Sequence, residues 1–504
     1  MNSVIENILP IINSNKPEHC TDLLNDLINE IYTLFNEIEE DDLSHSDEVF
    51  NLLVLINKGF EIIGPNCINF LTQVENCIEK ILIKLKNISK INSIISEFLC
   101  NIIIILSDNS KVNKNIKNRG KNYLDIIFNM IKLEYDTSTS IILVDNLNKI
   151  FEIIVSNLNQ NELEQIFDGI IKLIEFFENK IEVFISKKKS IDNEVKMEEE
   201  ISMNLDINNN DDDEEEDNKE IINKLDTDIE NLEQVNENLS LIIENMMKYS
   251  SGKKLKNISE VIYNKVIPLL LNSNNNSGNN IKIAVNLIDD IFEYLNFNKF
   301  TSHIIDDLIN KLIQYSNFWK PEVRQAANYG LGIFIKLSEP KIYQTNSFKI
   351  LKALKASYIN YPNNNTQDMK KYRAIGLASE NVIAAIGKAI EYKGLNIKEY
   401  ILLWIDNLPL SLDETEMEEE HDILCNFIIN NKYKEYNLEK NALIKCFKAL
   451  INIYKDKVKS NSDINIKIEA IFKNYEYKEI IEKIYIEYSK ENNINTNKFE
   501  KLIN

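Results

Sequence analysis

The segment from Trp319 to Ile333, WKPEVRQAANYGLGI, constrains the fold more than any other part of the chain. Pro321 opens a predicted helix at its first position, where a missing N–H costs nothing and φ is already set. Small and apolar residues then recur at intervals of three and four, which is the spacing of one buried helical face: Val323, Ala326, Ala327, Gly330, Phe334 and Leu337. The small residues allow a second helix to come close, so the segment predicts the inner helix of a packed pair.

Apolar helical segments recur at intervals of about 20 residues, and pairs of them at about 40, which is the range of HEAT repeats. Three such pairs are Glu18–Asn36 with Asp47–Ile63, Cys67–Leu85 with Ile91–Leu106, and Ser302–Tyr315 with Pro321–Leu337. The 504 residues include 11 glycines and 8 prolines, too few for the many turns of a β fold. Each helix pair must stack on its neighbours to bury an interior. The sequence therefore predicts an all-α HEAT-repeat (armadillo-like) α-solenoid superhelix.

The formal net charge is -22, and much of it is concentrated in one segment. Between Asp192 and Asp217 lie 13 acidic residues against one lysine, a net charge of -12. Like charges at this density favour a solvated, disordered insert. We place it at 186–226, between HEAT repeats at 1–185 and 227–504. The acidic balance argues against direct nucleic-acid binding.

The residue types of catalytic and metal sites are sparse. Only four histidines occur, none in a metal-ligand spacing, and the six cysteines have the spacing of buried core thiols. Gly330-Leu331-Gly332 lacks the third glycine of a dinucleotide-binding loop and lies within a predicted helix. We expect no catalytic residues, no cofactor and no metal. The longest apolar run is too short for a membrane span, and no signal peptide is evident, so we expect a soluble protein without membrane insertion.

Three ordered blocks resemble the importin-beta superfamily (the beta-karyopherins), and within it the C-terminal half of the karyopherin beta-3 branch, also called importin-5. The first block is the EVRQAANYGLG helix and the second reads ASENVIAAIGK. The third begins at Trp404 and continues through Leu408-Pro409-Leu410 and Asp413-Glu414 to Cys425. Together these blocks span residues 319–431, about a fifth of the chain.

The resemblance implies a nuclear transport receptor that binds protein cargo for import through the nuclear pore under control of the Ran GTPase. It implies basic cargo (nuclear localisation signals, histones or ribosomal proteins), Phe-Gly nucleoporins as further partners, and a place in cytoplasm, nucleus and nuclear pore. Family members are longer, so we expect this chain to lack the N-terminal Ran-binding repeats and to bind Ran weakly or not at all. The alternative is a HEAT-repeat scaffold subunit of a multiprotein complex without transport activity.

The candidate site residues each allow two interpretations. The acidic run is either an electrostatic lure for basic cargo or a solubilising loop, and it consists of Asp211, Asp212, Asp213, Glu214, Glu215, Glu216 and Asp217. Arg324 either links one repeat to the next through an aspartate or contacts a partner. Trp319 and Trp404 lie at predicted repeat edges, where each either anchors a Phe-Gly repeat or fills a junction, and we expect core filling for both.

Overall fold

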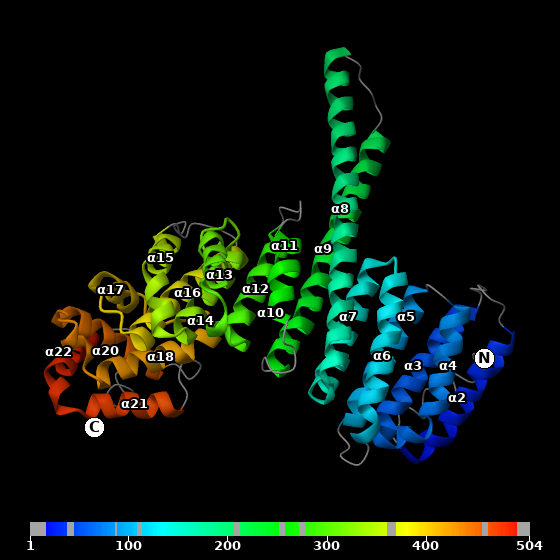
Figure 1. The fold of residues 1–504 in the computed structure, drawn as a ribbon, viewed down its shortest axis with the longest axis horizontal. Coiled ribbons are helices and arrows are strands. Elements are labelled where there is room, and N and C mark those ends of the chain that lie inside the picture. The colour runs from blue at the N-terminus through cyan, green and yellow to red at the C-terminus, as the bar shows by residue number, and fades with distance from the viewer. Residues whose placement is uncertain are drawn as a thin grey trace. The chain divides into compact units, whose positions relative to one another are not determined.

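The computed structural model describes residues 17–37, 45–85, 88–107, 113–205, 212–250, 258–271, 278–359, 369–455 and 462–490. Within these ranges every regular element is a helix and none is a strand. The chain divides into two compact units, Met1–Asn280 and Ile281–Asn504. Helix pairs stack in both units (Figure 1). The predicted all-α HEAT solenoid is therefore confirmed.

Unit 1 has two layers of helices. In one layer α3, α5, α7 and α9 pack side by side, and α2, α4, α6 and α8 form the other. Their bounds are α2 (Pro17–Glu37), α3 (Ser46–Ile63), α4 (Leu71–Lys84), α5 (Ser89–Ser107), α6 (Asn113–Leu133), α7 (Thr137–Ile154), α8 (Gln160–Leu205) and α9 (Asp212–Ser250). A short π-helical turn, Ile262–Val266, joins α10 (Ile258–Val261) to α11 (Ile267–Leu271).

Unit 2 repeats this plan after α12 (Asn279–Tyr294). Helices α14, α16, α18 and α21 pack in sequence along one layer, and α13, α15, α17, α20 and α22 form the second. Their bounds are α13 (Ser302–Tyr315), α14 (Pro321–Leu337), α15 (Pro340–Ile359), α16 (Met369–Lys393), α17 (Lys398–Asp406), α18 (Glu414–Ile429), α19 (Lys432–Glu435), α20 (Lys440–Lys455), α21 (Ser462–Lys473) and α22 (Lys478–Lys490).

Helix α14 is the helix predicted from the opening segment. Pro321 occupies its first turn, and Val323, Ala327 and Phe334 are fully buried. Gly330 is required for packing, because a Cβ there would lie 1.7 Å from Asp289 Oδ1 on α12. One predicted position is wrong: Leu337 is 41% exposed, since the helix ends there and its last turn leaves the core.

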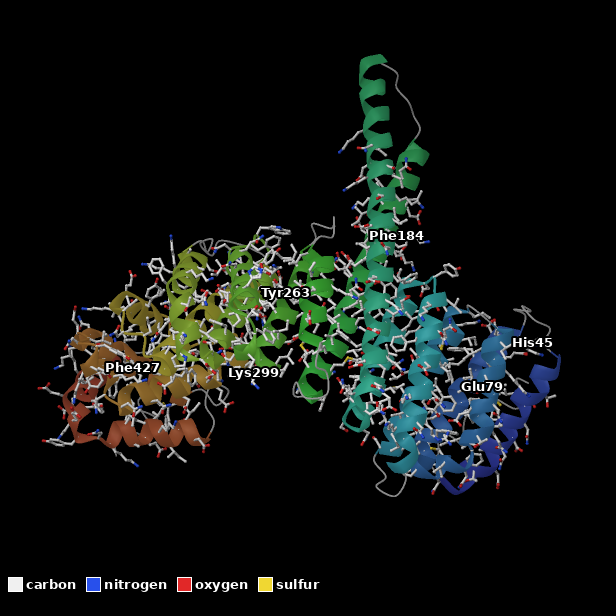
Figure 2. The ribbon with its side chains drawn as sticks, in the orientation of Figure 1. His45, Glu79, Phe184, Tyr263, Lys299 and Phe427 are labelled. Atoms are coloured by element: carbon white, nitrogen blue, oxygen red, sulfur yellow. The ribbon has the colours of Figure 1, made fainter. Side chains whose placement is uncertain are left out.

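Helices α8 and α9 continue past their neighbours as a two-helix arm (Figure 1). We define the arm as residues 182–205 of α8 and 212–229 of α9. Its seam begins inside the unit with Ile174, Phe177 and Ile181 of α8, all buried and spaced by three and four. Phe184, labelled in Figure 2, continues the same spacing. On α9, Leu225 and Ile229 face inward at an interval of four, the spacing that pairs two helices along a common stripe.

The arm corrects the prediction of a disordered insert at 186–226. Residues 186–205 and 212–226 are helical, and 206–211 lie outside the described residues. The physical reason is that an apolar stripe extends along α8 to Phe184 and along α9 to Leu225, beside the charged sequence, and favours helix there. Within the arm, Lys188 Nζ donates to both carboxylate oxygens of Asp226, at 2.5 and 2.6 Å. The division into repeats on either side of the insert stays a prediction.

Helix α5 is the one described helix that is long and apolar enough to cross a membrane by length and composition. Of its most apolar window, 61% is buried inside the stack. Its central residues Phe98, Leu99 and Ile102 are fully buried. Core packing accounts for this hydropathy.

Candidate protein-interaction sites

The sequence blocks that carry the resemblance meet in unit 2, where α16 packs between α14 and α18. Lys388 of α16 has a side chain that is only 1% exposed. Its Nζ donates to both carboxylate oxygens of Glu416 on α18, at 2.8 and 2.6 Å. A buried ion pair offsets its desolvation only with geometry of this quality. Lys388 and Glu416 therefore join two successive repeats.

Trp404 completes this buried contact. Its Nε1 donates to Glu420 Oε2 at 2.8 Å, and its ring lies 5.4 Å from that of Phe427, edge to face (Phe427 is labelled in Figure 2). Gly387 leaves room for both partners, because a Cβ there would lie 2.0 Å from Glu420 Oε2 and 2.6 Å from Trp404 Nε1. The predicted core-filling role of Trp404 is confirmed, since its side chain is fully buried.

Burial and neighbouring charges shift the pKa values of Glu420 and Lys388. Burial raises the pKa of Glu420 well above its ordinary value, which favours the protonated acid. Burial opposes the charge of Lys388, but the carboxylates of Glu416 and Glu419 outweigh it and raise the lysine pKa. Glu419 also accepts hydrogen bonds from Lys336 and Tyr392. The lysine is thus held as a cation among carboxylates.

A second contact lies at the start of α18. The Glu380 carboxylate accepts backbone N–H groups from Ser411, Leu412 and Asp413 at 2.7 to 2.9 Å. Asp413 in turn caps α18 by accepting from the N–H groups of residues 415 and 416, and it also accepts from Asn381 Nδ2 at 2.7 Å. We call the two contacts together the α16–α18 interlock. It shows why the residue types of these blocks occur together: they hold adjacent repeats in register.

The other predicted residues of unit 2 do not join this interlock. Arg324 is 6% exposed near the start of α14, and its link to an aspartate stays a prediction. Trp319 precedes α14 and is 68% exposed, so its expected core-filling role is wrong. Its ring instead lies 5.7 Å from that of Phe318, tilted by 39°, and the indole remains on the surface.

The acidic run lies at the outer end of the arm. Asp211 is outside the described residues, and residues 212–217 form the first turns of α9. Negative charge in the first turn of a helix interacts favourably with the positive end of its dipole. The acidic residues at the start of α9 therefore favour the helix, although their charge density alone predicts disorder.

Unit 1 is held by side-chain amides. Buried Glu178 of α8 accepts from Asn236 Nδ2 at 2.6 Å and Asn280 Nδ2 at 2.8 Å. The same residue types link neighbouring helices of the layer formed by α3, α5, α7 and α9: Asn101 donates to Asn57 and Glu61, and Asn245 donates to Asn148 and Glu152, at 3.0 to 3.2 Å. The sequence alone assigned no role to these asparagines, because a single polar residue in a helical segment does not show which side chain it meets.

Two grooves lie between helices. One, of about 350 Å³, lies between α4 and α6 and is lined by Glu75, Asn76, Ile78, Glu79, Leu99, Asn118, Arg119, Asn122, Tyr123 and Ile126. The other, of about 360 Å³, lies between α16 and the loop before α18, and includes Tyr358, Ser379 and Pro409. Within the described ranges, no three histidine, cysteine, aspartate or glutamate side chains are grouped as a metal site.

Comparison with solved structures identifies the fold. Kap121p bound to Pho4p matches with a TM-score of 0.54 and 15% identity, over 88% of this chain and 37% of that one. Kap121p bound to the SUMO protease Ulp1p matches with a TM-score of 0.53 and 15% identity, over 85% of this chain and 38% of that one. Importin beta matches with a TM-score of 0.51 and 12% identity, over 96% of this chain and 52% of that one. No protein-family model matches this sequence.

The chain thus spans 37 to 52% of the length of these three proteins. At 12 to 15% identity the likeness concerns the fold. Over 85 to 96% of its length, this chain has the stacked helix-pair fold of the karyopherin structures.

Proposed function

We propose that this chain is an importin-beta-like nuclear transport receptor, or a large part of one, that acts by binding protein cargo rather than by catalysis. The observation that carries the proposal is the karyopherin fold over most of the chain. The solved Kap121p structures include complexes with the proteins Pho4p and Ulp1p. The three ordered blocks at 319–431 support a place near the karyopherin beta-3 branch.

The chemistry of the chain favours basic cargo, such as nuclear localisation signals, histones or ribosomal proteins. A net charge of -22 creates a negative field that accelerates encounters with positive partners. The run Asp211–Asp217 concentrates that field at the end of the arm, where α8 and α9 extend past their neighbours. In this proposal the arm holds the acidic run away from the stacked repeats and exposes it to cargo in solution.

Transport also requires contact with the pore and with Ran. Trp319 is 68% exposed beside Phe318, which makes it available to the aromatic side chains of Phe-Gly nucleoporins. Because the chain spans 37 to 52% of the matched receptors, we propose that Ran-GTP binds it weakly or not at all without the remaining repeats. The protein would shuttle between cytoplasm and nucleus and concentrate at the nuclear pore.

A kinetic experiment tests the cargo proposal. A fluorescent lysine-rich nuclear localisation peptide is mixed with the full chain in a stopped-flow instrument, at low and at physiological salt. Replacing Glu214, Glu215 and Glu216 with glutamine should slow association several-fold at low salt, and the difference should shrink as salt screens the field. The matched control replaces three glutamates of unit 2, Glu414, Glu435 and Glu482, with glutamine. It should slow association less than the variant of the acidic run does.

Equal effects of the two triple variants would contradict a specific role for the acidic run. Receptor function is tested separately, by retention on Phe-Gly repeats and by accumulation of the tagged chain at the nuclear rim. A chain that stays away from the pore and co-purifies with one fixed enzyme would instead be a HEAT-repeat scaffold.

A further inference from the structure

A hydrogen bond and an ion pair connect the two walls of the groove between α4 and α6. The Glu75 carboxylate of α4 accepts a hydrogen bond from Tyr123 Oη of α6 at 2.6 Å and pairs with Arg119 of the same helix. Tyr123 is 2% exposed, so this contact between the two helices is largely shielded from solvent. Its volume of about 350 Å³ is at the lower end of the range for ligand sites, roughly 300 to 1,000 Å³.

The walls present side-chain amides that form no hydrogen bond to another residue in the part of the chain that the structure describes. Asn76 of α4 and Asn118 and Asn122 of α6 line the groove and are exposed. None of the three side chains hydrogen-bonds to another described residue, whereas many other asparagines of unit 1 do. A side-chain amide has two donors and one acceptor, and it can therefore match both the N–H and the C=O of a peptide bond.

The charge of the groove favours a cation. Its lining contains two carboxylates, Glu75 and Glu79, and one guanidinium, which is already paired with Glu75. Glu79 (labelled in Figure 2) is exposed and forms no ion pair within the described residues. The apolar side chains of Ile78, Leu99 and Ile126 complete the lining. Such a surface suits the methylene stem of a lysine whose ammonium group reaches a carboxylate.

We propose that this groove binds an extended peptide segment with a lysine or arginine at its centre. The three asparagine amides hydrogen-bond to the peptide backbone, Glu79 pairs with the basic side chain, and Ile78, Leu99 and Ile126 contact its stem. The inference does not rest on nuclear transport, because a scaffold could use the same groove. It also assigns a partner surface separate from the acidic run at the end of the arm.

The test uses the full chain and a labelled nonapeptide, Gly-Ala-Gly-Ala-Lys-Ala-Gly-Ala-Gly, with blocked ends. Binding is measured by fluorescence anisotropy, and a photo-crosslinking version of the peptide maps the site by mass spectrometry. Crosslinks are expected on α4 and α6. The double variant Asn118→Ala/Asn122→Ala should weaken binding about tenfold, the loss expected for two hydrogen bonds. Replacing the peptide bond after lysine with an ester should weaken binding to the natural chain more than to this variant.

Two controls separate the groove from the general negative field. Asn129→Ala removes the same side chain from α6 beyond the groove lining and should leave binding unchanged. Glu79→Gln should abolish the preference for lysine over norleucine in the peptide, whereas Asp125→Asn, an equal change of charge outside the lining, should preserve it. Crosslinks scattered over the chain, or equal effects of the groove and control variants, would overturn the proposal.

Discussion

Two buried carboxylates, one in each unit, have similar hydrogen-bond geometry but different donors. Glu178 in unit 1 accepts from two asparagine amides at 2.6 and 2.8 Å, and Glu416 in unit 2 accepts twice from Lys388 at the same two distances. The amide donors are 58 and 102 residues away in sequence, whereas the lysine is 28 residues away. The contact with a nearby lysine leaves a recognisable block in the sequence, and the contacts with distant asparagine amides do not.

Loss of the two contacts should also destabilise the protein to different degrees. Removing one partner of a buried ion pair leaves an uncompensated charge, which costs more than an unsatisfied neutral hydrogen bond. Lys388 should therefore contribute more to the stability of unit 2 than Glu178 contributes to that of unit 1.

Lys388→Met should have the largest effect. It leaves Glu416 and Glu419 without their buried cation and should lower the free energy of unfolding by about 3–5 kcal/mol. Urea unfolding can be followed by Trp404 fluorescence in a Trp319→Phe background. The control Lys445→Met breaks an exposed pair with Asp406 and should cost less than about 1 kcal/mol. Equal costs for the two variants would mean that burial gives the Lys388 contact no special weight.

Glu178→Gln tests the amide contact of unit 1. One of the two asparagine amides would then face an NH₂ group instead of an oxygen, and the unpaired donor should cost about 1–3 kcal/mol. Calorimetric unfolding gives the comparison with Lys388→Met. A loss larger than that of the lysine variant would reverse the order of the two contacts.

The pH dependence of stability tests an ionic contact in unit 1, the one between Glu162 and two lysines. Burial opposes ionisation, but hydrogen bonds from Lys117, Asn159 N–H and Lys121 lower the pKa of Glu162 to about 2. A lowered pKa means stability that is complete above the ordinary value, about 4.5, and is lost as pH falls toward 2. Melting temperatures between pH 6 and 2 should fall less steeply in Glu162→Gln. Parallel curves for the two proteins would argue against this assignment.

Asp226→Asn should have the smallest effect. The Lys188–Asp226 pair of the arm is 31% and 45% exposed, so its removal should change stability by about 0–1 kcal/mol. Scanning calorimetry suffices for the measurement. A loss above about 2 kcal/mol would mean that the arm contributes to the folding of unit 1 rather than extending from it.

The helices were predictable because their apolar spacing is a local property. Ser302–Tyr315 was predicted with its observed bounds, and Glu18–Asn36 to within one residue at each end. The α16–α18 interlock was visible as a set of residue types, but not as a contact, because spacing does not show which carboxylate meets the lysine. Trp319 and Trp404 appear equivalent in sequence, and only tertiary packing buries one and exposes the other.

For the acidic segment, the sequence predicted less regular structure than the protein has. Its charge density predicts disorder, and yet the stripe that includes Phe184 and Leu225 continues from the unit into the arm and favours helix. The groove of α4 and α6 could not be predicted either, since its walls come from two helices that α5 separates in the sequence.

The regular spacing of the α8 and α9 seam makes the arm a molecular ruler. Adding one seven-residue repeat to each helix would lengthen it by about 10 Å while keeping every seam residue on the same side. Adding a single residue to each would instead turn the outer end by about 100° around the helix axis. Reach and direction of the acidic run can therefore change independently of the helix pairs below it, through length alone.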